Sequence, residues 1–448
     1  MNKNNLLRYS IVAALAGFIF GFYTVVISGA NKPIKELWHT TPLFHGFFIM
    51  SMALWGTVVG AIFGGIPTEI FGRKKVLLWI GILFSVSAIG SALATNPYMF
   101  SFFRFIGGLG IGVSSVAAPT YISEISTPKT RGRLVGMYQF NIVFGIFIAY
   151  FSNYLLKGVG GDNDWRWMLG VMAIPSLLYT IMVFGVPESP RWLITIKSNL
   201  QKARQVLVLV GAENPDADIN DIIEANNAIQ KGSGYQLLGK KYRKVMWLAF
   251  FVAFFNQWSG INFILYYAPQ ILQSAGIAAK DSLASSIALG GTNLVFTFVG
   301  LYLIDRIGRK QLLVIGSFGY ILSLISVAIC FKYGASNTAL LTSLMVFIAS
   351  HAIGQGAVIL VFISEIFPNN VRGFGQSFGA SVHWIFAAII TLITPYFLDE
   401  DSGIYGKDPW PIFAFFAFMM ALQLIWVLTK VPETKGVSLE DLEKKLIK

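Results

Sequence analysis

The sequence predicts an all-α membrane protein with twelve transmembrane helices, arranged as two six-helix bundles related by an internal repeat. Of the 448 residues, 55% are hydrophobic and only 12% are charged, about half the charged fraction of a typical soluble protein. Apolar runs of about 20 residues, long enough to cross a bilayer as helices, recur along the chain. Short charged motifs recur in the same order in both halves.

The apolar runs give the predicted spans, with boundaries good to a few residues. The first run lacks a small-residue cleavage site, so we interpret it as a retained span and not as a signal peptide. The predicted spans are 9–30, 44–68, 76–95, 98–122, 133–156, 165–186, 245–273, 282–303, 311–331, 340–363, 373–398 and 411–429.

The net charge of +12 follows from the distribution of basic residues. Most of the 34 lysines and arginines fall in segments on the same side of the predicted membrane as the N-terminus. This asymmetry obeys the positive-inside rule, so we expect a multi-pass protein of the cell membrane (inner or plasma membrane) with both termini in the cytoplasm. The basic excess then reflects topology, and no nucleic-acid partner is expected.

The spans divide the chain into three parts. Residues 1–186 form the predicted N-terminal six-helix bundle, 187–244 a cytoplasmic loop, and 245–448 the C-terminal bundle with a short cytoplasmic tail. Within the loop, 202–211 and 216–229 have helical periodicity, and Asp216 or Asp218 is the expected cap of the second helix.

Three pairs of motifs follow equivalent spans of the two halves, at a near-constant offset. They are EIFGRKK (69–75) with DRIGRK (305–310), SEISTPKTRG (123–132) with SEIFPNNVRG (364–373), and PESPR (187–191) with PETKG (432–436). Such a parallel duplication is typical of secondary transporters that alternate access around a central site.

An enzyme is not expected. The sequence has no metal-ligand cluster, no nucleophile with an adjacent base and no phosphate loop, and its one cysteine, Cys330, excludes an internal disulfide and a cysteine-based metal site. The close glycines of RFIGGLGIG (104–112) lie within a span, where helix packing explains them. We therefore predict no cofactor and no metal.

These motifs, together with PESPRWL (187–193) and above all NQWSGINFILYYAP (256–269), resemble the sugar porter family of the major facilitator superfamily. The resemblance runs through nearly the whole chain. It implies a secondary transporter that moves a neutral monosaccharide (hexose or pentose) or polyol by alternating access, with the sugar and membrane lipid as partners. We expect a monomer.

Charged residues of the repeated loops are candidates for a cytoplasmic latch, in which acids and arginines pair across this face and separate when it opens. Arginine suits this role because its fork binds a carboxylate in a bidentate manner. The family pattern D-R-x-G-R is complete at Asp305, Arg306 and Arg309, but the first loop reads Glu69–Arg73 and lacks one arginine, so we expect it to be weaker. The latch candidates are Glu69, Arg73, Glu124, Arg131, Glu188, Arg191, Asp305, Arg309, Glu365, Arg372 and Glu433.

Intramembrane amides are the candidate substrate ligands, because each carries an acceptor oxygen and two donor hydrogens that match sugar hydroxyls. Gln257 and Asn262 lie about 140° apart on an ideal helix and share a cavity only if the helix loosens at Ser259–Gly260. The resemblance implies sugar contacts at Gln139, Asn256, Gln257, Asn262 and Asn293.

Two positions depart from the family. Its tryptophan in the tenth span is Leu360, and its amide–tryptophan pair in the eleventh is His383–Trp384. By the same resemblance, His383 and Trp384 are also candidate substrate-binding residues. No charged side chain occurs among the predicted ligands, which argues against phosphorylated sugars, amino acids and organic acids.

Proton coupling needs an intramembrane group that gains and loses a proton. Family symporters keep an aspartate in the first span, thought to pair with the arginine that matches Arg104, but FGFYTVVISG (20–29) places Tyr23 there. We therefore favour a uniporter. The alternatives are proton symport through His383 or another group, with His351 a weaker candidate, and a non-transporting sugar sensor, which the short tail disfavours.

Overall fold

The computed structural model describes residues 3–228, 239–368, 371–406, 408–437 and 439–447. Within these residues, twelve helices or joined helix segments are long and apolar enough to cross a membrane. All twelve predicted spans are confirmed.

The first half contains α1 (Lys3–Trp38), α2 (Pro42–Phe44), the π-helical turn η1 (His45–Ser51), α3 (Met52–Phe63), α4 (Gly65–Phe71), α5 (Arg73–Ala92), α6 (Pro97–Ile125), α7 (Pro128–Leu156), η2 (Gly161–Asn163), α8 (Asp164–Gly170) and α9 (Ala173–Phe184). The connecting loop contains α10 (Pro190–Thr195), α11 (Leu200–Val210) and α12 (Pro215–Ala228). The second half contains η4 (Lys240–Tyr242), α13 (Arg243–Trp258), α14 (Ile261–Ser274), α15 (Ala279–Ile307), α16 (Arg309–Tyr333), α17 (Asn337–Ile353), α18 (Gln355–Ile366), α19 (Arg372–Leu398), α20 (Trp410–Lys430) and the terminal α21 (Leu439–Leu446).

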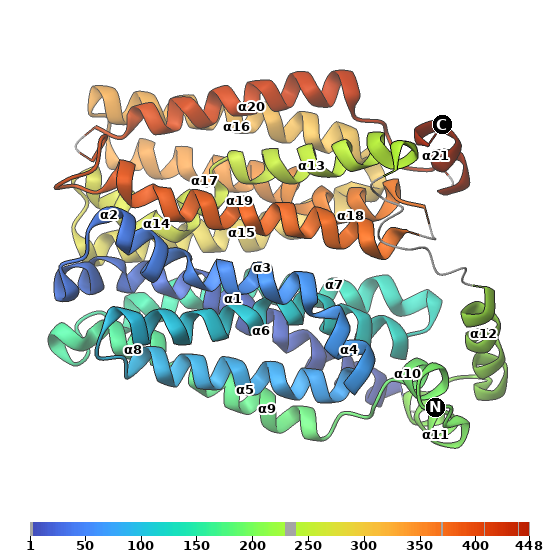
Figure 1. Ribbon diagram of the computed structural model, residues 1–448. Coiled ribbons are helices and arrows are strands. Elements are labelled where there is room, and N and C mark those ends of the chain that lie inside the picture. Colours follow the sequence, from blue (N-terminus) through green and yellow to red (C-terminus); the bar gives the residue numbers. More distant parts are fainter. Residues whose placement is uncertain (1–2, 229–238, 369–370, 407, 438, 448) are drawn as a thin grey trace.

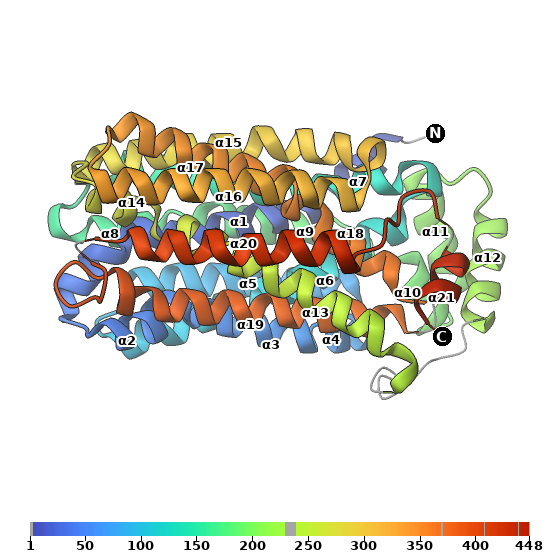
Figure 2. The same ribbon diagram turned by 90° about the horizontal axis from the view of Figure 1, so that it is seen from above.

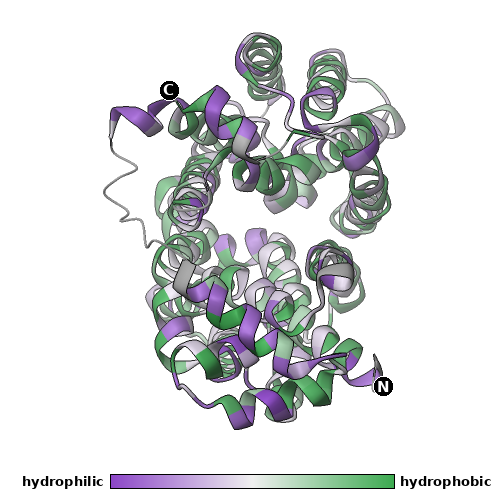
Figure 3. Ribbon diagram, turned by 90° about the vertical axis from the view of Figure 1, so that its right-hand side faces the viewer, coloured by the Kyte–Doolittle hydropathy of each residue, from purple (hydrophilic) through white to green (hydrophobic). Residues whose placement is uncertain are grey.

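The helices gather into two bundles, α1–α9 and α13–α20, that lie side by side along their length (Figures 1 and 2). Seen along the bundle axis, the two groups are distinct (Figure 3). The end that carries α10–α12, α21 and both chain termini is called the loop end here, and the opposite end the far end (Figure 1).

The glycines of RFIGGLGIG pack α6 against α3, as the sequence predicted. A Cβ on Gly108 would lie 1.9 Å from the carbonyl oxygen of Ala53, and one on Gly112 would lie 2.4 Å from that of Thr57. Because no side chain fits in these gaps, the glycines allow the two helix backbones to approach closely.

Both predicted loop helices are present, but the predicted cap of the second is wrong. The Asn214 side chain accepts a hydrogen bond from the backbone N–H of Ala217 at 3.1 Å. Pro215 takes the first helical position, where its missing N–H costs no intrahelical bond, so the cap is the residue before it. Asp216 and Asp218 lie in the first turn instead, where their charge favours the helix dipole.

Candidate functional site

The seventh span is broken in its middle, at the Ser259–Gly260 pair that the sequence singled out as the place where a loosened helix would let Gln257 and Asn262 share a cavity. α13 ends at Trp258, Gly260 has a left-handed backbone (φ +88°), and α14 starts at Ile261. A side chain at Gly260 would be strained by this φ, and its Cβ would meet the Phe416 ring at 2.8 Å. The break interrupts the regular helix between Gln257 and Asn262.

An amide cluster, formed by Asn256, Gln257, Asn262 and His383, surrounds this break. Asn262 Nδ2 donates to Gln257 Oε1 at 2.7 Å, and Gln257 Nε2 donates to Asn256 Oδ1 at 3.0 Å. Both ring nitrogens of His383, on α19, lie 3.2 Å from Gln257 Nε2. The three amides are buried, so the break has brought Gln257 and Asn262 to one place.

Aromatic rings border the cluster. The Trp384 ring stands edge-on to His383, with centroids 4.8 Å apart, and lies 5.6 Å from the Phe20 ring of α1. Trp384 therefore contacts both halves beside the amides. Polar amides beside the flat apolar faces of aromatic rings fit a ligand that has both hydroxyl groups and C–H faces.

Two predicted ligands are not joined to the cluster. Gln139, on α7, is half-buried, and Asn293, on α15, is buried. Among the residues that the structure describes, no hydrogen bond links either side chain to the four cluster residues. Their assignment stays a prediction.

Tyr23 and Arg104 meet inside the first half. The Tyr23 hydroxyl donates to the carbonyl oxygen of Arg104 at 3.0 Å and lies 2.8 Å from Ser87 Oγ. The Arg104 guanidinium carbon sits 4.0 Å from the centre of the Tyr23 ring. Arg104 is only 1% exposed, and among the described residues no carboxylate pairs with it.

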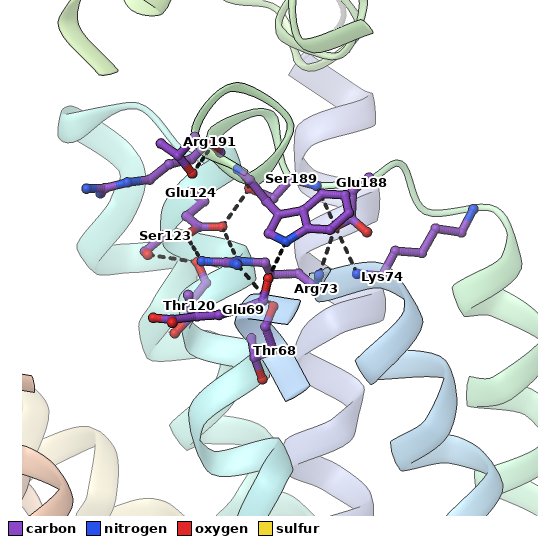
Figure 4. Close-up of polar contacts among 12 residues, drawn as sticks. Thr68, Glu69, Arg73, Lys74, Thr120, Ser123, Glu124, Glu188, Ser189 and Arg191 are labelled. Atoms are coloured by element: carbon purple, nitrogen blue, oxygen red, sulfur yellow. Dashed lines mark hydrogen bonds and ion pairs between the residues drawn. The ribbon is translucent and has the colours of Figure 1, made fainter. Parts of the chain in front are cut away.

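At the loop end, Arg73, Glu124, Glu188 and Ser189 form an N-half arginine cluster (Figure 4). Arg73 binds Glu124 through two bonds of 2.8 Å, from Nε and Nη2. Glu188 accepts the backbone N–H groups of Arg73 and Lys74 at the start of α5, at 2.9 and 3.0 Å. Ser189 Oγ donates to Glu124 at 2.6 Å and closes the network.

A C-half arginine cluster repeats this arrangement with Arg309, Glu365, Glu433 and Thr434. Arg309 binds Glu365 through bonds of 3.1 and 2.8 Å, and Glu433 accepts the backbone N–H of Arg309 at 2.9 Å. Thr434 Oγ1 donates to Glu365 at 2.6 Å. Each cluster stays within its own half.

The other latch candidates differ between the halves. Asp305 pairs with Arg309 at 3.2 Å, whereas among the described residues Glu69 forms no ion pair. The predicted weakness of the first loop stays a prediction, because Arg73 and Arg309 each form a bidentate pair with a glutamate. Arg131 and Arg372 donate to the carbonyl oxygens of Ser123 and Phe367, and Arg191 lies on α10 beside the N-half cluster (Figure 4).

Comparison with known proteins decides the family. Residues 9–446 match the family model described as sugar (and other) transporter. The chain belongs to this sugar transporter family.

Similar proteins cover almost all of the chain. The arabinose–proton symporter of Bacillus subtilis is 33% identical over 98% of this chain and 94% of its own length. The D-xylose transporter of Levilactobacillus brevis is 34% identical, with 97% and 94% covered. The partially occluded inward-open structure of the Escherichia coli xylose transporter XylE has a TM-score of 0.85 at 28% identity, with 97% of this chain and 100% of that chain covered.

The chain is thus a multi-pass sugar transporter of the major facilitator superfamily and not an enzyme. Its two bundles are the halves of this fold. The amide cluster lies close to the boundary between them, since Trp384 contacts both His383 of the cluster and Phe20 of the other bundle.

Sequence reasoning missed the polar contacts that join the two halves of the transporter at the far end. Lys35 of α1 forms ion pairs with Asp399 and, at 3.3 Å, with Asp401. On the same helix, Lys32 pairs with Glu400 at 3.4 Å. The clustered acids at 399–401, opposite two lysines at the end of the first span, were the available signal.

An amide contact accompanies these ion pairs. Asn31 Nδ2 donates to Gln270 Oε1 of α14 at 2.8 Å, and Asn31 Oδ1 lies 2.7 Å from His45 Nε2. The pairs made by Asn31, Lys32 and Lys35 with the second half are called the far-end contacts below.

Asp399 is the most buried acid of the far-end contacts, with a side chain 4% exposed. Burial alone would raise the pKa of this carboxyl. Hydrogen bonds from Lys35 and Ser402 together outweigh burial and lower the pKa below its ordinary value. Asp399 is therefore a charged partner for Lys35 at neutral pH.

Proposed function

We propose that this transporter carries a neutral monosaccharide or polyol by alternating access, and that the amide cluster binds it. The observation that carries the proposal is the convergence of Asn256, Gln257 and Asn262 at the helix break. Each amide can donate to one sugar hydroxyl and accept from another. The cluster contains no charged side chain, which favours a neutral substrate over an ionic one.

The names of two relatives support a pentose as the substrate. Arabinose and xylose, the sugars in these names, are pentoses. His383 stands where the family has an amide and contacts Gln257 of the cluster, whereas Leu360, where the family has a tryptophan, is 61% exposed. The preferred sugar of this chain is therefore a separate question for a transport screen.

We propose uniport as the mode of transport. Arg104 is buried beside Tyr23, and among the described residues no carboxylate pairs with it. The tyrosine hydroxyl, with an ordinary pKa near 10, does not cycle readily in this range. Sugar would then move down its gradient without a coupled proton.

Proton symport is the second candidate, favoured by the arabinose–proton symporter among the relatives. His383 is its carrier, because an imidazole titrates near neutral pH and this one contacts Gln257 of the amide cluster. Proton uptake at His383 would then alter the hydrogen bonds available to sugar.

The arrangement of contacts supports an inward-facing state, with the loop end in the cytoplasm. The far-end contacts tie the two halves together at the opposite end, and the matched XylE structure is described as inward open. Both termini are then cytoplasmic, in agreement with the basic residues of the loops.

Reconstitution in liposomes tests these proposals. Gln257→Ala and Asn262→Ala are expected to lower sugar counterflow at least tenfold, since each removes a side chain that can make two hydrogen bonds of about 1 kcal/mol each. Asn141→Ala is the matched control, because Asn141 donates to its own helix at Met137. Wild-type counterflow in both cluster variants would refute the site.

The same liposomes separate uniport from symport. A uniporter equilibrates labelled sugar but does not accumulate it when a pH gradient is imposed. Accumulation that a protonophore abolishes would replace uniport by symport, and its loss in His383→Ala would identify the carrier. Labelled hexoses, pentoses and inositols, tested in parallel, give the substrate.

A further inference from the structure

A basic pocket of about 390 Å³ lies at the loop end, between the start of α13 and the terminal helix α21. It is distinct from the amide cluster and from both arginine clusters. Its cationic lining residues are Lys240, Lys241, Arg243, Lys244 and Lys445.

Folded elements hold the two walls of this pocket together. Leu442 and Leu446 of α21 are 1% and 3% exposed and belong to the same apolar core as Val245 of α13. Lys244 Nζ donates to the carbonyl oxygen of Lys445 at 3.3 Å. Figures 1 and 2 show α21 at the loop end near the start of α13. The cationic residues therefore lie on folded segments that pack against each other.

The charge of the pocket is unbalanced. Among the described residues, no carboxylate lines it, and none of the five cations forms an ion pair within 4 Å. On α21, Asp441 pairs with Lys444 at 3.7 Å, and neither residue lines the pocket. Five like charges around one cavity repel one another, and an anion in the cavity would relieve that repulsion.

The position of the pocket indicates the chemical class of the anion that it binds. The seventh span starts at Lys240, so the pocket lies where this span leaves the membrane. Trp247 also lines the pocket and is 49% exposed, as is common for tryptophans at the headgroup level. Lysine ammonium groups and the arginine fork both bind phosphate oxygens well.

We propose that the basic pocket binds a phosphate-bearing anion, such as the headgroup of an anionic phospholipid in the adjoining leaflet. Basic residues that only orient a span need neither a cavity nor a docked helix. Here α21 forms one side of an open pocket and contributes Lys445, so cations from both ends of the second half line one hollow. A soluble phosphate ester would offer the same chemistry, and the experiment separates the two sources.

The test uses the full-length protein in neutral detergent. Binding of phosphatidylglycerol and of phosphatidylcholine is measured by native mass spectrometry, and binding of glycerol 3-phosphate by calorimetry. The pocket variant is Lys240→Gln/Lys241→Gln/Lys445→Gln. The control variant is Lys197→Gln/Lys202→Gln/Lys444→Gln, which removes the same charge from the same end outside the pocket lining.

We expect the protein to retain phosphatidylglycerol in preference to phosphatidylcholine. The pocket variant is expected to bind it roughly a hundredfold more weakly, because each basic residue near an anionic headgroup contributes about a fivefold gain. Lys445→Gln alone should weaken binding several-fold, which keeps the test valid if the triple variant is unstable. The control variant should bind like the wild type.

Two other outcomes are decisive. Pocket-dependent binding of glycerol 3-phosphate, without retained lipid, supports the phosphate site and assigns it a soluble ligand. If the pocket and control variants bind both probes equally well, the proposal is overturned. Neither result depends on sugar transport.

Discussion

The guanidinium of Arg104 lies over the ring of Tyr23, 4.0 Å from its centre, while the hydroxyl of the same ring bonds the Arg104 backbone. A buried cation without an acid is costly unless other groups stabilise it. The face of an aromatic ring attracts a cation, and this attraction strengthens where water is excluded. The ring of Tyr23 thus stabilises the buried charge of Arg104.

This relationship predicts different outcomes for two substitutions of Tyr23. Tyr23→Phe keeps the ring under Arg104 and loses only the hydroxyl bonds, so we expect about 1–2 kcal/mol of destabilisation and sugar counterflow within a few-fold of wild type. Tyr23→Leu removes the ring as well and should lower thermal stability further, by about another 2 kcal/mol. Unfolding monitored in detergent measures both. Equal melting temperatures for the two variants would show that the ring does not stabilise Arg104.

The break in the seventh span predicts a strong effect of a single methyl group. Gly260→Ala places a side chain at φ +88° and against Phe416, so we expect a loss of about 1–3 kcal/mol and a drop in sugar binding as Asn262 moves away from Gln257. Gly291→Ala is the control, because its Cβ would make only ordinary contacts with Phe147. Binding and melting temperature are measured together. Unchanged sugar affinity in Gly260→Ala would contradict the role of the break.

The repeated arginine clusters predict matching effects in the two halves. Glu124→Gln and Glu365→Gln each destroy a bidentate ion pair at a mostly buried arginine, and each should cost about 3 kcal/mol of stability. Thermal unfolding of both variants checks this. Arg204→Gln breaks the exposed pair with Asp216 and should change little, because solvent screens that pair. A large loss in one half and none in the other would refute the equivalence of the clusters.

The far-end contacts predict how the conformational equilibrium responds to mutation. Asp399→Asn weakens the buried partner of Lys35, so we expect the far end to open more often. The exposed pair is the control, since Glu400→Gln, which alters the partner of Lys32, should have little effect. Spin labels at exposed Leu37 and Ile404, in a Cys330→Ser background, report the separation of the halves by pulsed resonance. Identical distance distributions for Asp399→Asn and wild type would contradict the proposed role.

The lowered pKa of Asp399 sets the sign of the pH response. Ionised Asp399 stabilises the far-end contacts fully at any pH above the ordinary aspartate pKa, near 4. This stabilisation is lost as the pH falls through the lowered pKa of Asp399 in the folded protein. Far-end closure is therefore expected to stay constant between pH 5 and 8 and to weaken only below about pH 4. The same labels follow this change, which Asp399→Asn should abolish.

Hydropathy predicted the spans well because each span must satisfy its own backbone in lipid, so the signal is local. The sequence also indicated the place of the break at Gly260. Gln257 and Asn262 would point in different directions on a regular helix, and Ser259–Gly260 lies between them. The cap at Asn214 was missed although the signal, an asparagine before a proline, was present. The far-end contacts depend on how two distant halves meet, as Lys35 and Asp399 lie in different bundles. The acids at 399–401 and the lysines at the end of the first span are visible in the sequence, but the local sequence does not show that they meet.

The duplicated clusters at Arg73 and Arg309 have a consequence for how this transporter can evolve. Each cluster fastens helices within one bundle, whereas the contacts of Lys35 and Asp399 fasten one bundle to the other. The residues that stabilise each bundle are therefore different from the residues that hold the two bundles together at the far end. Substitutions among the far-end contacts can therefore change the transport rate. The melting temperature, which depends on contacts inside each bundle, is then expected to change little.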